Sequence, residues 1–168
     1  MTQTSNDSGM SYIRFLAMIA TGTVVMYGLM YLNTYEWDHV RFSQTRAWMA
    51  LLMGATMAVI MLGFMWRMYG RLQINLMILG LAIAGFAGSL WLVRSQATVG
   101  DVSYMKAMIP HHSIAIMTSR RAEISDPRVR DLANRIIEAQ VKEIGEMNTL
   151  IADIEATGDA PGDPAPVR

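Results

Sequence analysis

Cysteine is absent from the sequence, which excludes both a disulfide framework and a thiolate metal site. Basic and acidic residues balance at 14 each, so the composition does not favour the basic face that a nucleic-acid partner requires. The histidine pair at 111 and 112 has no acid at Glu-x-x-His spacing, and no Ser-His-Asp or Cys-His arrangement stands out. We therefore expect neither an enzyme nor a nucleic-acid-binding protein.

Long apolar runs dominate what is present, since 52% of the residues are hydrophobic. Three runs of about 20 residues, the length that crosses a bilayer as a helix, lie at residues 12–32, 47–66 and 72–93. The first is longer than the core of a signal peptide and ends in "YLNTYEW" without a small-x-small cleavage site. The pattern therefore predicts three transmembrane helices and a protein that resides in a lipid membrane.

Basic residues in the short loops indicate the orientation. Arg67 and Arg71 stand without an acid between the second and third runs, whereas the preceding loop mixes acidic and basic residues. The loop with Arg67 and Arg71 is therefore predicted to be cytoplasmic. In a bacterial inner (plasma) membrane, the N-terminus is then cytoplasmic and the chain after Arg94 is periplasmic or extracellular.

The remaining segments divide into polar ends, a linker and one module that faces water. The leader 1–11 and the Pro-, Gly- and Asp-rich tail 156–168 are predicted to be disordered, with a linker at 94–100. Residues 101–155 are interpreted as a helical hairpin. Its first helix is capped by Asp101 or Ser103 and runs to about Ile124, and its second begins at Asp126 and Pro127.

The second helix of this hairpin has an apolar stripe that repeats every three or four residues, with a polar break at Gln140. Two helices cannot enclose a core, because each hides only one stripe against the other. We therefore predict an all-α protein whose ferritin-like hairpin completes a four-helix bundle as a homodimer or higher oligomer. The stripe comprises Val129, Leu132, Ile136, Ile144, Met147, Ile151 and Ile154.

The stretch "MKAMIPHH" places soft sulfur and imidazole donors on one helix. At about 100° per residue, Met105, Met108 and His112 share the buried face, within roughly 60° of one another. His111 falls about 120° away and joins them only through a bend at Pro110 or through a neighbouring chain. Thioether and imidazole ligands together favour Cu(I), with Ag(I) as a chemical mimic.

Methionine also recurs in the second apolar run, at strict four-residue intervals. This line winds around the helix, because four residues overshoot one turn by about 40°. It is either a sulfur ladder for a soft ion or a set of flexible apolar residues facing lipid and other helices. In the third run, Gly80, Ala84 and Gly88 form a small-xxx-small face suited to close helix packing. The ladder comprises Met49, Met53, Met57, Met61 and Met65.

The stretches "MKAMIPHHSIAIM" and "VRDLANRIIEAQVKEIGEM" resemble the domain-of-unknown-function 305 family, which includes CopM-like periplasmic copper-binding proteins. The resemblance covers about 50 residues of the C-terminal region and implies a ferritin-like helical bundle without ferroxidase chemistry, which binds Cu(I) or Ag(I). Gln140 and Glu143 would hold the ligands in place. The ligand positions carried over are Met105, Met108, His111, His112, Met117 and Met147.

Three functions follow as alternatives. The first is a membrane-anchored protein that binds Cu(I) or Ag(I) for copper handling or tolerance and exchanges copper with a donor or acceptor protein. The second is a copper permease-like channel that uses the methionine ladder. The third is a structural module whose hairpin drives oligomerisation without metal.

Overall fold

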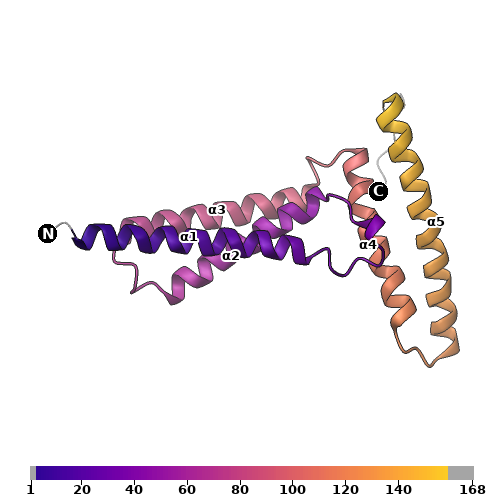
Figure 1. Cartoon of the computed structure of the whole chain (residues 1–168), viewed down its shortest axis with the longest axis horizontal. Coiled ribbons are helices and arrows are strands. Elements are labelled where there is room, and N and C mark those ends of the chain that lie inside the picture. The colour runs from indigo at the N-terminus through magenta and orange to yellow at the C-terminus, as the bar shows by residue number, and fades with distance from the viewer. Residues whose placement is uncertain (1–2, 159–168) are drawn as a thin grey trace. The chain divides into compact units, whose positions relative to one another are not determined.

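The computed structural model describes residues 3–158, with side chains from residue 11 onward. All regular structure in that range is helical, as the sequence predicted. The chain divides into two units: residues up to Leu32 with Gln44–Val99, and Asn33–Ser43 with the chain from Gly100 onward. The elements are α1 Gln3–Leu29, the short 3-10 helix η1 Trp37–His39, α2 Gln44–Phe64, α3 Leu72–Ser95, α4 Asp101–Arg121 and α5 Pro127–Thr157 (Figure 1).

The helices α1, α2 and α3 build the first unit, and each contains a stretch long and apolar enough to cross a membrane. Their outward surfaces are apolar, since Val24, Leu81 and Phe64 are 70%, 67% and 90% exposed. Such a surface is unfavourable in water and suits a hydrocarbon environment. The three apolar helices expected from the sequence are therefore present.

Most helix ends lie within a few residues of their predicted positions. The difference is larger at the N-terminus. There α1 begins at Gln3 and covers most of the segment 1–11 that was predicted to be a disordered leader. Once a helix has formed, each added residue gains a hydrogen bond, and no proline interrupts this leader. At the other end α5 continues through Thr157, and residues 159–168 of the predicted disordered tail lie outside the described range.

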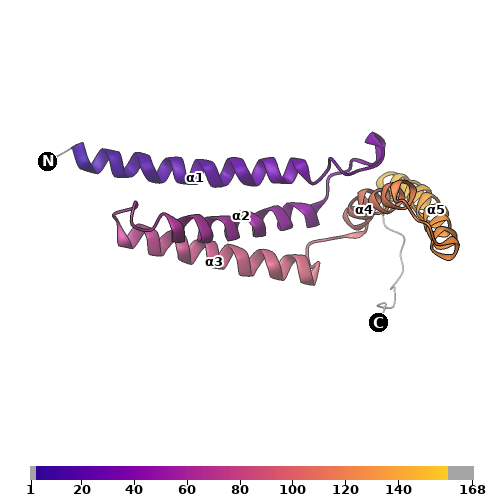
Figure 2. The same ribbon diagram turned by 90° about the horizontal axis from the view of Figure 1, so that it is seen from below.

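Helix α2 packs against both α1 and α3 and lies between them in the view of Figure 2. Close approach of α1 and α2 depends on glycine. A Cβ atom added at Gly54 would collide with the side chain of Thr23, and one added at Gly22 would lie 2.9 Å from the terminal methyl carbon of Met57. Small residues at a helix interface let the backbones approach in this way.

Polar side chains tie α1 to the start of α3. The Tyr12 hydroxyl donates to Asn75 Oδ1 at 2.7 Å, and Asn75 Nδ2 donates to the Tyr69 carbonyl at 3.0 Å. Asn75 is only 1% exposed, so these bonds satisfy an amide that would otherwise be buried without partners. The rings of Tyr12 and Tyr69 also stack, with centroids 4.9 Å apart. This network fixes the position of α1 relative to α3.

Replacement of Tyr12 by phenylalanine should destabilise the first unit by about 0.6–1.7 kcal/mol, the range for hydrogen bonds between membrane helices. The ring stays, but Asn75 Oδ1 loses its donor. Unfolding of the full chain in mixed detergent micelles measures the change. Tyr104→Phe, at a residue 56% exposed, is the control and should change nothing measurable. Equal stability of the two variants would mean that the Tyr12–Asn75 hydrogen bond does not stabilise the first unit.

The second unit is built on the antiparallel hairpin of α4 and α5 (Figure 1). The predicted start of α5 is confirmed, since Asp126 Oδ1 accepts from the Arg128 backbone N–H at 2.8 Å and Pro127 is the first helical residue. Hydrogen bonds from the Arg128 side chain and then from its backbone lower the pKa of Asp126. Helix α4 ends at Arg121, before the predicted Ile124, and Arg130 Nη2 donates to the Ala122 carbonyl at 3.1 Å.

Candidate metal site

The buried face of α4 carries one of the predicted methionine ligands. Met105, Ile109 and Ile116 point into a cluster with Ile144 and Ile151 of α5. Their spacing of four and seven residues places them on one side of α4. Met105 is 7% exposed, so its thioether lies within the core between the two helices. Met147 packs against the same cluster from α5. The structure thus brings the predicted ligands Met105 and Met147 into one apolar core.

His112 lies at the edge of this core, and both of its ring nitrogens are engaged. Nδ1 is 3.0 Å from the Met108 carbonyl oxygen, and Nε2 is 2.7 Å from Glu143 Oε2 on α5. A carbonyl oxygen only accepts, so Nδ1 carries the proton in this bond. Nε2 is therefore the nitrogen available to a metal ion, as in metal-binding histidines whose second nitrogen donates to a carbonyl or carboxylate.

Glu143 contacts His112, and Gln140 contacts Glu143. Gln140 Nε2 lies 3.4 Å from the same Glu143 oxygen that faces the imidazole. The His112 side chain is 17% exposed and that of Glu143 49%, so the pair lies at a surface open to solvent. A carboxylate hydrogen-bonded from two sides is held in position in front of Nε2. Gln140, the polar residue that interrupts the apolar stripe of α5, therefore lies beside the carboxylate that contacts the histidine.

The other predicted ligands do not converge on this point. His111 is exposed, with its ring centroid 6.4 Å from that of His112. Pro110 is buried inside an α4 that continues to Arg121, so the proposed bend does not bring His111 to the buried face. Met108 and Met117 are partly buried. Among residues 3–158, no group of three His, Asp or Glu side chains is arranged to hold a metal ion.

The methionine ladder of α2 does not line the groove between the three apolar helices. Met49 is 43% exposed, Met57 lies against Gly22 of α1, and Met61 and Met65 pack beside the core of the first unit. The groove between the three apolar helices, about 580 Å³, is lined on α2 by leucine, glycine and alanine. The winding of a four-residue repeat distributes the sulfurs around the helix.

The small-xxx-small face of α3 points away from α2. Gly80, Ala84 and Gly88 are exposed, and a Cβ added at either glycine would meet nothing within 4 Å. The buried residues of α3 instead include Ile78 and Ala82, which share a different face. The small residues therefore do not mediate packing within the described part of the chain.

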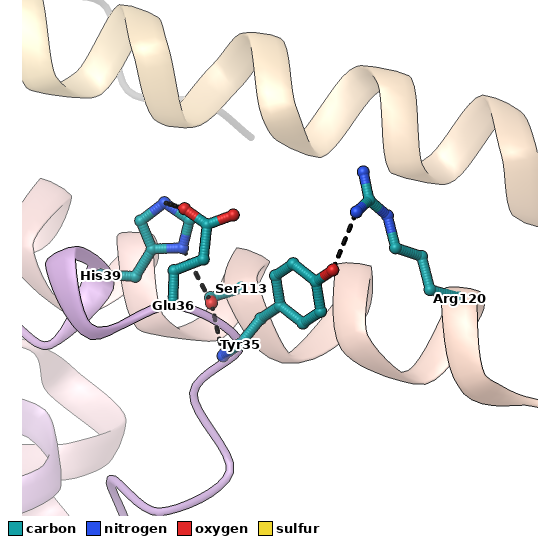
Figure 3. Close-up of polar contacts among 5 residues, drawn as sticks. All are labelled: Tyr35, Glu36, His39, Ser113 and Arg120. Carbon is teal, nitrogen blue, oxygen red and sulfur yellow. Dashed lines mark hydrogen bonds and ion pairs between the residues drawn. The ribbon is translucent and has the colours of Figure 1, made fainter.

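The structure also contains a contact that sequence reasoning missed. The loop between α1 and α2 packs on α4 around Ser113, which is completely buried. Ser113 Oγ accepts from the Tyr35 backbone N–H at 2.9 Å and lies 2.9 Å from His39 Nδ1 (Figure 3). His39 Nε2 is 3.7 Å from Glu36 Oε2. A Glu-x-x-His spacing at Glu36–His39 was the available signal, in a loop interpreted only as a connection.

Arg120 completes this contact from the end of α4. Its Nη1 donates to the Tyr35 hydroxyl at 2.8 Å, and its guanidinium carbon lies 5.2 Å from the centre of the tyrosine ring (Figure 3). A small cavity of about 100 Å³ lies beside these groups, with Ile144 of α5 in its wall. The loop is therefore an integral part of the second unit.

Ser113→Ala should release the loop 33–43 from α4. The Tyr35 amide then loses its acceptor, a loss that costs about 1–3 kcal/mol for a buried group. Hydrogen exchange at the Tyr35 amide should accelerate by about 5-fold to 150-fold, the equivalent of that energy. Ser119→Ala on the same helix serves as the control. Unchanged exchange at Tyr35 would show that Ser113 does not hold the loop.

Comparisons with known proteins place the C-terminal half in context. Residues 95–164 match a family model described as "Domain of unknown function (DUF305)", which confirms the resemblance and covers the hairpin. An uncharacterised protein of Acanthamoeba polyphaga mimivirus is 44% identical over 61 residues, which are 35% of this chain and 40% of that protein. The chain thus spans about two-fifths of the curated relative that it matches. No solved structure matches the chain.

Proposed function

Because a DUF305 domain follows three helices long and apolar enough to cross a membrane, we propose that the protein is a membrane-anchored binder of soft metal ions. Its cargo is Cu(I), with Ag(I) as a mimic, and its role is copper handling or tolerance at the outer face of the membrane. It carries or stores the ion and has no enzymatic activity. A copper donor or acceptor protein would exchange the ion with the hairpin.

One observation carries the proposal, which is the position of the His112 ring. The bond from Nδ1 to the Met108 carbonyl orients the ring, so that Nε2 lies at the α4–α5 surface, 2.7 Å from Glu143 Oε2. A cation bound at Nε2 would have the Glu143 carboxylate as its neighbour.

Sulfur donors near this histidine support a soft ion. Met105 and Met147 share the core beneath the hairpin surface, and Met108 belongs to the turn that orients the imidazole. Thioether and imidazole donors without thiolate favour Cu(I) over Zn²⁺ or Mg²⁺. Methionine side chains are flexible, so the positions of these sulfurs can adjust to a bound ion.

The anchoring part of the proposal rests on the first unit and on the loop charges. Arg67 and Arg71 favour a cytoplasmic loop between α2 and α3, which places the hairpin outside, in the periplasm for a bacterial inner membrane. Trp37 and Phe42, in the segment between α1 and α2, are 87% and 67% exposed. Exposed aromatic residues near the ends of membrane helices are typical of the lipid–water interface.

No observation favours the permease alternative, since the apolar groove of the first unit has no methionine among its lining residues. The proposal is tested with the full chain in detergent micelles, by competition for Cu(I) against a colorimetric chelator. We expect Cu(I) binding that is at least tenfold weaker in the His111→Ala/His112→Ala double variant. Unchanged affinity in that variant would remove the site assignment.

A further inference from the structure

Part of the predicted apolar stripe of α5 stays exposed in the single chain. Val129 and Leu132 are each 48% exposed and Ile136 is 36% exposed. Leu150, which lies outside the predicted stripe, is 51% exposed. The core of the hairpin uses Ile144 instead, on a neighbouring face of the helix. The exposed residues form the α5 seam, which comprises Val129, Leu132, Ile136, Ala139, Glu143 and Leu150.

The α5 seam follows a seven-residue repeat. Val129, Ile136, Glu143 and Leu150 are each seven residues apart, and Glu143 is the polar member of this line. A seven-residue apolar repeat keeps one face of a helix against a partner helix, and a single polar residue within it fixes the register. The surface therefore fits another helix.

The charges beside the seam identify that helix. Arg128 and Arg135 flank its N-terminal half, and Glu146 and Asp153 flank its C-terminal half, within a sector of about 20° on the helix. Within one chain, exposed ion pairs already join Arg128 to Asp126, Arg135 to Asp131 and Glu146 to Lys142. A parallel copy would bring like charges together, whereas an antiparallel copy sets the arginines against the acids. The complementary partner is thus the α5 of a second copy, in antiparallel orientation.

The register follows from Glu143. Ile136 and Leu150 both lie seven residues from it. An antiparallel pair centred on Glu143 therefore places Ile136 of each copy opposite Leu150 of the other. Registers that set Glu143 against Ile136 or Leu150 would bury a carboxylate on an apolar side chain, which is costly. In the centred pair the two-fold axis passes beside Glu143, so the two Glu143 carboxylates face each other and leave a place for a cation between them.

We propose that two copies pair in this way and that the partner's His112 and the partner's Glu143 complete a metal site on the axis. Within one chain, His112 Nε2 and Glu143 Oε2 are 2.7 Å apart, and no third such donor joins them in the described residues. Two copies supply two imidazoles and two carboxylates, a four-donor set that suits Zn²⁺ or Cu²⁺. The cation also balances the two carboxylates. This inference rests on the proposed function only in taking His112 as a ligand.

Disulfide cross-linking in membranes tests the pairing directly, since the chain has no cysteine of its own. Full-length Ile136→Cys and Leu150→Cys chains, co-expressed with different tags, should form a mixed disulfide. Either variant alone should not, because like residues would lie about 21 Å apart along the helix, beyond disulfide reach. The control pair Glu138→Cys and Asn148→Cys is also centred on Glu143 but lies on other faces of α5, and should not cross-link. A disulfide in Ile136→Cys alone, or none in the mixture, would overturn the pairing.

Titration with Zn²⁺, which is not redox-active, tests the shared site in the full chain. We expect one Zn²⁺ per two chains, and a monomer with at least tenfold weaker Zn²⁺ binding in Leu132→Glu/Ile136→Glu. Hydrogen exchange at Ile144 checks that the hairpin core of this variant is intact. One Zn²⁺ per chain, or undiminished affinity in the monomer, would overturn the shared site. If the chain binds Zn²⁺ as expected but does not take Cu(I) from the colorimetric chelator, the proposed function would be wrong and the shared site would stand.

Discussion

Replacing Ile109 with alanine is expected to lower the free energy of unfolding of the hairpin by about 2–5 kcal/mol. Ile109 has no exposed surface and packs in the cluster that joins α4 to α5. Removing three carbons there loses their transfer energy and leaves a cavity that a two-helix core can only partly close. Hydrogen exchange of the α4 and α5 amides, in the full chain in micelles, measures the loss.

Val141→Ala is the matched control for this experiment. Val141 belongs to α5 but is 52% exposed, so the same measurement should change by less than about 0.5 kcal/mol. A similar effect of the two substitutions would mean that Ile109 is not the centre of the hairpin core. A loss at Ile109 confined to α4 would mean that the two helices do not unfold together.

The second large effect is expected at the adjacent histidines, which differ sharply in their surroundings. His112→Ala should weaken Cu(I) binding at least tenfold, or about 1.4 kcal/mol, because it removes the oriented Nε2 donor. His111→Ala should change affinity less than about threefold, since this ring is exposed and the structure does not direct it toward Glu143. Competition with a colorimetric Cu(I) chelator gives both values.

Helicity measured by circular dichroism should be equal in the two single variants, so that the comparison reports on the ligands. Equal losses of affinity in both variants would contradict the geometry, because they would require His111 to reach the same ion. A larger loss in His111→Ala would reverse the assignment and make the exposed ring the ligand.

The membrane helices and the hairpin were predictable because their signals are local. Three apolar runs and the Asp126–Pro127 start are read directly from the sequence, and all are present in the structure. On α4, Met105 and Ile109 are buried and His111 is exposed, as the helical phase predicted. Met108 and His112, which were predicted on the same buried face, are only partly buried. A period of 3.6 residues fixes which side chains share a face, whatever the partner.

Contacts between distant segments could not be predicted in the same way. No periodic pattern marks Tyr35 and His39, whose positions depend on the loop folding back onto Ser113 of α4. The pairing of His112 with Glu143, rather than with a methionine sulfur, depends on the register of two helices joined by a short turn. The apolar stripe of α5 also did not predict that Leu132 and Ile136 stay exposed in the single chain, because α4 covers only one side of the stripe.

The most direct test of the central claim is the nitrogen NMR signal of the His112 ring in the full chain as Ag(I) is added. Ag(I) is a redox-stable mimic of Cu(I), and each ring nitrogen reports its own proton or metal bond. We predict that the Nε2 resonance of His112 shifts on Ag(I) binding while Nδ1 keeps its proton and its bond to the Met108 carbonyl. An unchanged Nε2 resonance at saturating Ag(I), or metal at Nδ1, would contradict the account.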